Sequence, residues 1–269
     1  MRLTPDQGIA YEAVGADDAV DTLVLVHGSL CDWRYWMPQL RGLADTFRVV
    51  APSLAHYHPR LPSAASTPFS WQAHVEQLVR FLPRLTAKRL HLVGHSRGAL
   101  VSYQLAIRKP ELVTSLTLVD PGGRGAGFDG DGNIRQQAAD MIAAGRVEDG
   151  LRLFVDGVSQ PGLWDRSPPA FREMTLDNAG TLVKQLADPL PPYVATQAQA
   201  IGVPVLIVDG ERSPAAFREN ARQLGEWIPG AMRVTIANAS HGMTLTHFQR
   251  FNRELATFVQ ALRAGPPGG

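Results

Sequence analysis

The sequence lacks the features that mark secreted, membrane-spanning or nucleic-acid-binding proteins. Its 269 residues include one cysteine, Cys31, so no intramolecular disulfide can form and no oxidising compartment is indicated. The 26 basic and 25 acidic residues give a net charge of +1, which offers no electrostatic basis for binding nucleic acid or an anionic membrane. No apolar run approaches the ~18 residues of a membrane span, and the first residues lack a signal-peptide stretch. We therefore expect a soluble cytoplasmic protein, either a monomer or a homodimer.

Short apolar runs recur along the chain and predict buried β-strands. The six runs are residues 22–28, 47–53, 89–95, 115–121, 203–210 and 232–238. Their apolar residues are consecutive, which is typical of strands buried on both faces of a parallel sheet. Segments of helical period lie between them, at residues 32–45, 70–85, 97–110 and 247–264. Alternating strands and helices predict an α/β fold with a doubly wound, mostly parallel sheet.

One long stretch interrupts this alternation. Residues 122–202 contain no convincing buried strand, and their helical patterns fall at residues 134–145, 147–158 and 170–187. This length far exceeds that of an ordinary loop, which favours a lid over a simple crossover connection. We predict a helical cap over residues 122–202, inserted into a core of residues 1–121 and 203–264, and a disordered tail at residues 265–269.

The pentapeptide GHSRG, residues 94–98, stands where a predicted strand gives way to a helical pattern. It fits the G-x-S-x-G pattern of a sharp strand-to-helix turn, in which a strained serine presents its hydroxyl at the apex. The N-terminus of the following helix favours negative charge beside that hydroxyl. We predict that Ser96 is a nucleophile. The alternative is an inert serine in a tight turn.

A serine hydroxyl is a weak nucleophile at neutral pH and needs a base, which is usually a histidine. His241, in the segment NASHGM, follows the last predicted strand and precedes the closing helix. In a parallel sheet this loop lies at the same carboxyl edge as Ser96, so His241 is the predicted general base. His27 and His95 are interpreted as structural residues of tight loops.

The first predicted strand ends in the dipeptide His27-Gly28, and the loop after it can direct a main-chain N–H towards the serine. We predict that the N–H groups of Ser29 and Arg97 are the two donors that stabilise a tetrahedral oxyanion. Cys31, in the same loop, is interpreted as a small packing residue.

Five segments together resemble the α/β-hydrolase superfamily over nearly the whole chain: VLVHGS, GHSRGA, LVDP, PVLIVDGERSP and ASHGM, in this order. Within the superfamily, the chain is most similar to small, cap-bearing, esterase-like serine hydrolases. The resemblance implies an eight-stranded, mostly parallel sheet with a helical cap after the sixth strand. It also implies a site between the core and the cap.

The chain departs from many members of the superfamily at the usual position of the triad acid. Relatives carry an aspartate three residues after the glycine that ends the seventh strand, but this chain has Ser213, which cannot supply a negative charge. Asp120, at the end of the sixth strand, is the predicted acid, because some branches of the superfamily place their acid there. Glu211 and Asp209 are the alternatives, and Asp120 would then be a turn residue before Pro121.

These residues predict a serine hydrolase that cleaves a small-molecule carboxylic ester or lactone through an acyl-enzyme, without a metal or organic cofactor. We expect His56 and His58 at the site entrance, and Trp164 from the cap beside the substrate. The alternatives are other chemistry with the same residues, namely C–C bond hydrolysis, acyl transfer or a lyase reaction, and a non-catalytic small-molecule receptor.

Overall fold

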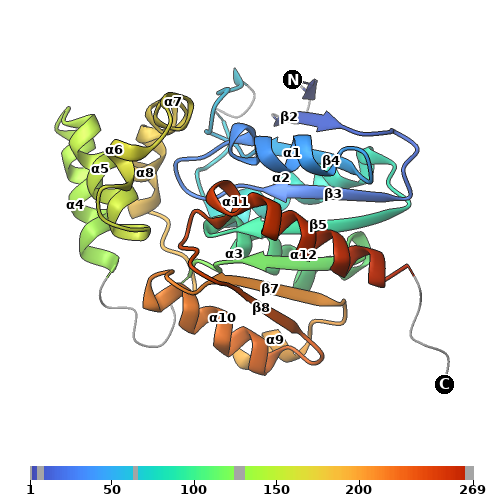
Figure 1. The fold of residues 1–269 in the computed structure, drawn as a ribbon. Coiled ribbons are helices and arrows are strands. Elements are labelled where there is room, and N and C mark those ends of the chain that lie inside the picture. The colour runs from blue at the N-terminus through green and yellow to red at the C-terminus, as the bar shows by residue number, and fades with distance from the viewer. Residues whose placement is uncertain (1, 5–8, 63–65, 124–130, 264–269) are drawn as a thin grey trace.

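The computed structural model describes residues 2–4, 9–62, 66–123 and 131–263 (Figure 1). The predicted tail at 265–269 lies outside the described residues, as does the part of the predicted cap at 124–130. None of the helices in the described residues combines the length and the apolar character needed to cross a membrane.

An eight-stranded sheet forms the centre of the molecule, with strand order β1-β2-β4-β3-β5-β6-β7-β8. Strands β3 to β8 run parallel to one another, whereas β2 pairs antiparallel with both β1 and β4. The strands are β1 (Arg2–Thr4), β2 (Ile9–Val14), β3 (Asp21–Val26), β4 (Arg48–Ser53), β5 (Arg89–His95), β6 (Ser115–Val119), β7 (Val205–Gly210) and β8 (Met232–Ile236).

The six apolar runs of the sequence coincide with β3 to β8. β3, β4, β6 and β7 are buried at every residue, as their continuous apolar runs predict. β8 pairs with β7 alone and is exposed over much of its length, so it is an edge strand. No individual run predicted β1 or β2. The half-buried Tyr11 and Glu12 in the middle of β2 interrupt its apolar pattern.

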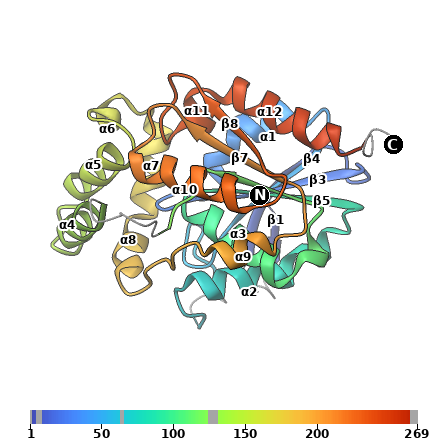
Figure 2. The ribbon, with the colours of Figure 1, turned by 90° about the horizontal axis from the view of Figure 1, so that it is seen from below.

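Helices cover both faces of the sheet because successive strand residues point to opposite sides. In β3, Leu23 and Leu25 join the core under one helical layer, whereas Val24 and Val26 join the core under the other. The first layer contains α1 (Met37–Leu43), α11 (Met243–Thr246) and α12 (Phe248–Ala261). The second contains α2 (Trp71–Phe81), α3 (Arg97–Arg108), α9 (Ala195–Gln199) and α10 (Ala215–Trp227). Figure 2 shows α1 and α12 on one side of the sheet, and α2, α3 and α9 on the other.

Of the six helices that the described residues form between β6 and β7, the first five gather at one end of the sheet, on the left of Figures 1 and 2. They are α4 (Asp131–Ala143), α5 (Val147–Val158), α6 (Leu163–Arg166), α7 (Pro169–Asp177) and α8 (Ala179–Leu186), here called the helical segment. Its helices pack around an apolar cluster that includes Leu151, Phe154 and Leu182, and Leu30 and Phe217 of the core join this cluster. The remaining short helices are 3₁₀ turns at Trp33–Trp36, Leu82–Leu85 and Pro110–Leu112.

Candidate active site

Ser96 occupies a strained turn between β5 and α3. Its φ of 55° and ψ of −119° lie in a region that residues with side chains seldom adopt. The flanking glycines permit this turn because the chain crosses itself closely there. A Cβ on Gly98 would lie 2.4 Å from the carbonyl oxygen of Val26, and one on Gly94 would lie 2.4 Å from the carbonyl oxygen of Gly98. The sequence therefore folds locally so that the Ser96 side chain stands at the apex of the turn.

His241 and Asp120 come together at the same edge of the sheet. Asp120 directly follows β6, and His241 lies in the loop between β8 and α11. The Asp120 carboxylate is fully buried, and its Oδ2 lies 2.9 Å from His241 Nδ1. With Nδ1 directed at the carboxylate, the other ring nitrogen of His241, Nε2, is the one that can accept a proton from a serine.

Ser213 also contacts this carboxylate. Its hydroxyl donates a hydrogen bond of 2.6 Å to Asp120 Oδ2, the oxygen that faces His241. The main-chain N–H of Gly210 approaches the other carboxylate oxygen at 3.4 Å. Ser213, at the position where the resemblance would place an acid, is thus a neighbour of Asp120 at the end of β6.

The two alternative acids face other partners. Asp209 pairs with Arg233, whose Nη2 lies 2.7 Å from Asp209 Oδ2, and also accepts a 2.9 Å hydrogen bond from Thr235. Glu211 accepts a 2.7 Å hydrogen bond from the main-chain N–H of Asn238. Among the described residues, neither carboxylate contacts His241, so of the three candidates the geometry favours Asp120.

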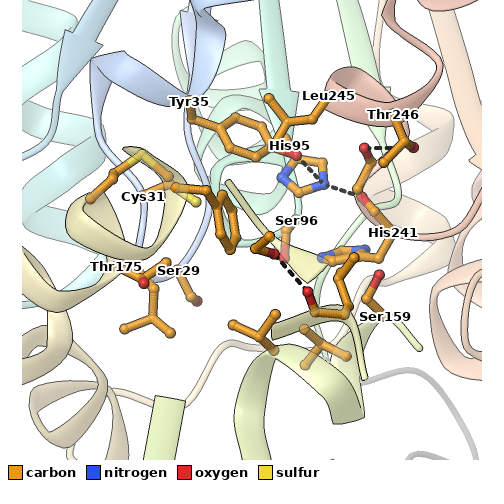
Figure 3. Close-up of a pocket in the computed structure, with 18 of the residues that line it drawn as sticks. Ser29, Cys31, Tyr35, His95, Ser96, Ser159, Thr175, His241, Leu245 and Thr246 are labelled. Carbon is orange, nitrogen blue, oxygen red and sulfur yellow. Dashed lines mark hydrogen bonds between the residues drawn. The ribbon is translucent and has the colours of Figure 1, made fainter. Parts of the chain in front are cut away.

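Two aromatic rings pack against the His241 imidazole. Phe217 of α10 stacks on it with ring centroids 4.1 Å apart and an interplanar angle of 24°. The His95 ring lies against it with centroids 4.6 Å apart. Ser96 and His241 line the same cavity and face its open space, as Figure 3 shows. In this conformation, the structure shows no hydrogen bond between the two described side chains.

His95 also fixes the main chain that carries His241. Its Nε2 lies 2.9 Å from the carbonyl oxygen of His241 and 3.3 Å from the hydroxyl of Tyr35 (Figure 3). Burial, together with the charge of the nearby His241, holds the pKa of His95 well below its usual range. A neutral His95 that donates to the carbonyl oxygen is therefore a fixed support for the loop.

The two residues predicted to supply oxyanion donors lie close to Ser96. Gly28 packs so closely that a Cβ there would lie 3.0 Å from Ser96 Cβ, which brings the loop containing Ser29 against the serine. Arg97 is the first residue of α3. Among the hydrogen bonds of the described residues, none uses the main-chain N–H of Ser29 or Arg97. Both N–H groups are therefore available to an oxygen bound at Ser96.

His27, just before this loop, is a structural residue, as the sequence suggested. Its Nε2 accepts a 3.0 Å hydrogen bond from the main-chain N–H of Leu54, and its Nδ1 lies 2.9 Å from the carbonyl oxygen of Gly28. Burial lowers the pKa of His27 to about 4, so the ring is neutral at neutral pH. Cys31, further along the loop, is buried on the cavity wall, and burial raises the pKa of its thiol.

The cavity at Ser96 has a volume of about 580 Å³ and is bounded by the core on one side and the helical segment on the other. Most of its wall is apolar. The core contributes Leu30 and Leu245, and the helical segment contributes Phe154, Val158, Leu163 and Phe171. Such a surface favours an apolar group on the bound molecule.

Two residues predicted at the site entrance do not line this cavity. His56 has a φ of 72°, and its ring turns towards Thr67, whose carbonyl oxygen lies 2.7 Å from Nε2. His58 points towards Asp177, with 3.7 Å between Nδ1 and Oδ2. The prediction that these histidines bind substrate at the cavity is therefore corrected, because the loop after β4 directs both rings elsewhere.

Trp164 is also absent from the cavity wall. Its side chain is buried within the apolar cluster of the helical segment, and its main-chain N–H donates to Asp156 Oδ1 at 2.8 Å. The prediction of substrate contact is corrected here too, because α6 turns Trp164 inward while the adjacent Leu163 lines the cavity.

Phe217 is the main site residue that the sequence reading missed. Phe217, Ala221 and Leu224 recur at helical spacing and are buried on one face of α10, so the sequence did contain a signal for this helix. The spacing alone does not predict that the Phe217 ring packs against His241.

The fold agrees with the comparison with known proteins. The family described as "Alpha/beta hydrolase family" matches residues 23–254, and the chain belongs to this family.

Three relatives illustrate the match. The chain is 25% identical over 254 residues to carboxylesterase YbfK of Bacillus subtilis (strain 168), covering 92% of this chain and 82% of that protein. It is 22% identical over 271 residues to "Putative carbamate hydrolase RutD" of Pantoea ananatis (strain LMG 20103), covering 96% and 95%. The structure of naproxen esterase (carboxylesterase NP) from Bacillus subtilis matches with a TM-score of 0.76 and 21% identity, covering 93% of this chain and 87% of that one. The last likeness supports the fold alone.

Proposed function

We propose that this protein is a serine hydrolase that cleaves carboxylic esters or lactones through an acyl-enzyme. The observation that carries the proposal is the 2.9 Å contact between His241 Nδ1 and Asp120 Oδ2 beside the strained Ser96 turn, at one cavity. The carboxylesterase among the relatives supports the same class of reaction.

The reaction begins when Ser96 Oγ attacks the ester carbonyl carbon and its proton passes to His241 Nε2. A rotation of the serine about its Cα–Cβ bond brings the hydroxyl into hydrogen-bond reach of the imidazole. Asp120 stabilises the imidazolium that forms. The N–H groups of Ser29 and Arg97 bind the negative oxygen of the tetrahedral intermediate.

The second half of the reaction releases both products. The bond from the carbonyl carbon to the alcohol oxygen breaks, and the alcohol takes the proton from His241. Water then attacks the carbonyl carbon of the acyl-enzyme while His241 removes a proton from the water. The resulting intermediate releases the carboxylic acid, and the proton returns to Ser96.

In this proposal the helical segment acts as a cap that supplies most of the substrate pocket. Phe154, Val158 and Phe171 would contact an apolar acyl or alcohol group, because they line the cavity opposite Ser96. An ester with a medium-length alkyl or an aromatic group fits a cavity of about 580 Å³ with such walls.

The test combines covalent labelling with turnover. A fluorophosphonate should label the wild-type protein at Ser96 and leave Ser96→Ala unlabelled, as read by intact-protein mass spectrometry. p-Nitrophenyl esters of increasing acyl length should be hydrolysed by the wild type, with kcat/KM rising from acetate to medium chains. A wild-type protein that is neither labelled nor active, or a Ser96→Ala variant with full activity, would refute the proposal.

A further inference from the structure

Both predicted oxyanion donors belong to residues whose side chains are anchored by the same short stretch of the helical segment. The Ser29 hydroxyl donates a 2.8 Å hydrogen bond to Gln185 Oε1, near the end of α8. The Arg97 guanidinium forms a buried ion pair with Asp188, just beyond the end of that helix. Gln185 and Asp188 are themselves buried, with 1% and 8% of their surface exposed, so these contacts are shielded from water.

The core in turn fixes these two side chains. Gln185 Nε2 donates to the hydroxyl of Tyr57 at 3.3 Å, and the Tyr57 ring packs edge-on against His27 with centroids 4.6 Å apart. Asp188 Oδ2 also accepts a 2.8 Å hydrogen bond from the main-chain N–H of Trp71, the first residue of α2. Each anchor therefore has a second hydrogen bond that limits its motion.

The position of these anchors matters because an oxyanion donor works only when it points at the developing charge. A displacement of about 1 Å in a catalytic group can cost about 10²-fold in rate. Ser29 lies in a loop, where little besides its neighbours fixes the direction of its N–H. The negative charge of Asp188 is paired with Arg97, so it adds little repulsion towards an oxyanion nearby.

On the basis of the proposed function, we propose that Gln185 and Asp188 are positioning residues of the oxyanion hole. They hold Ser29 and Arg97 so that both main-chain N–H groups face the oxygen that becomes negative. Neither residue touches the substrate. The end of α8 thus makes the helical segment part of the catalytic apparatus as well as a wall of the cavity.

The test compares Gln185→Met, Ser29→Ala and the double variant with the wild type. Ser29→Ala keeps the main-chain N–H but removes the hydroxyl that bonds Gln185. Two quantities are measured: the second-order rate of fluorophosphonate labelling, in which a phosphorus-bound oxygen occupies the oxyanion hole, and kcat and KM for p-nitrophenyl butyrate. Lys184→Ala, an exposed neighbour on α8, is the matched control.

We expect Gln185→Met to lower both kcat and the labelling rate by about 10-fold, with little change in KM, because the effect falls on the transition state. Ser29→Ala should give a similar loss. The double variant should be no slower than the slower single variant, because both changes break the same bond. Lys184→Ala should keep wild-type rates.

A second variant pair tests the other anchor. Asp188→Asn leaves the buried Arg97 charge without its carboxylate and should lower thermal stability as well as the labelling rate. Asp188→Glu restores the charge and should recover part of the labelling rate. Circular dichroism melting identifies any loss of rate that comes from unfolding. If Asp188→Asn unfolds, the Gln185 and Ser29 variants decide the inference.

The possible failures are distinguishable. If the wild type is labelled and Gln185→Met is equally fast, or if the Gln185→Met and Ser29→Ala effects multiply in the double variant, the positioning role is wrong and the proposed function stands. If the wild type is not labelled, the proposed function fails and the positioning role falls with it.

Discussion

The strongest prediction concerns the acid at the end of β6 and its neighbour after β7. Replacing Asp120 by asparagine keeps the shape of the side chain but removes the charge that stabilises a protonated His241. We expect kcat to fall by about 10² to 10⁴-fold, equivalent to about 3 to 5 kcal/mol of transition-state stabilisation. Steady-state hydrolysis of p-nitrophenyl butyrate measures this loss.

The position of Ser213 suggests a second variant that tests the same assignment of Asp120. Asp120 Oδ2 lies 2.6 Å from Ser213 Oγ and 2.9 Å from His241 Nδ1, so one oxygen contacts both residues. An aspartate side chain is one bond longer than a serine side chain, which would bring a carboxylate at residue 213 close to His241. The double variant Asp120→Asn/Ser213→Asp should therefore recover at least about tenfold of the lost kcat, a fraction of what the acid contributes.

One control variant tests the assignment of the acid. Glu211→Gln should keep nearly wild-type kcat, because Glu211 contacts the main chain of Asn238 rather than His241. If Glu211→Gln is crippling and Asp120→Asn is not, the assignment of the acid is wrong. If the double variant is folded but no faster than Asp120→Asn alone, the reasoning from the shared oxygen is wrong.

Three further predictions concern the serine, the ring beside the histidine and a buried histidine. Ser96→Ala should lose up to about 10⁶-fold in kcat while keeping the thermal stability of the wild type, and an active alanine variant would end the serine mechanism. Phe217→Leu should lower kcat by about tenfold at constant pH, because the His241 ring loses the stacked surface that orients it. A variant with unchanged kcat would show that Phe217 only packs. Burial lowers the pKa of His27 from 6.5 to about 4. As the pH falls, the imidazole of His27 is therefore protonated near pH 6.5 in the unfolded chain but only near pH 4 in the folded chain. The free energy of unfolding should therefore fall by about 3 kcal/mol as the pH drops through this window, and urea titrations at several pH values should show a shallower fall for His27→Gln.

The sequence predicted the central part of the fold well because buried parallel strands have a simple signature. The apolar runs in β3 to β7 need no tertiary information, since both faces of these strands are covered. No apolar run indicated β1 or β2, which only the resemblance to the superfamily implied, because the partly exposed Tyr11 and Glu12 break the apolar pattern of β2. The helical spacing of Phe217, Ala221 and Leu224 is itself a signal for α10.

The topology of a parallel sheet predicts which loops of the chain meet at the candidate site. Ser96, Asp120 and His241 each follow a strand of the parallel sheet, and such loops share one edge, which explains why the structure brings them together. The topology does not predict the direction in which a side chain points within such a loop. The positive φ of His56 and the inward turn of Trp164 depend on contacts made far away in the sequence, so proximity to the site could not be deduced from their position.

The three residues of the proposed triad follow strands that differ in how well the sheet holds them. Ser96 and Asp120 follow β5 and β6, two adjacent strands in the middle of the sheet, whereas His241 follows the exposed border strand β8. Borders of a sheet open locally at lower free energy than its middle. On warming, the loop that carries His241 should therefore open before the whole molecule unfolds, which separates His241 from Ser96 and Asp120. Catalytic activity should be lost at a lower temperature than the far-ultraviolet circular dichroism signal.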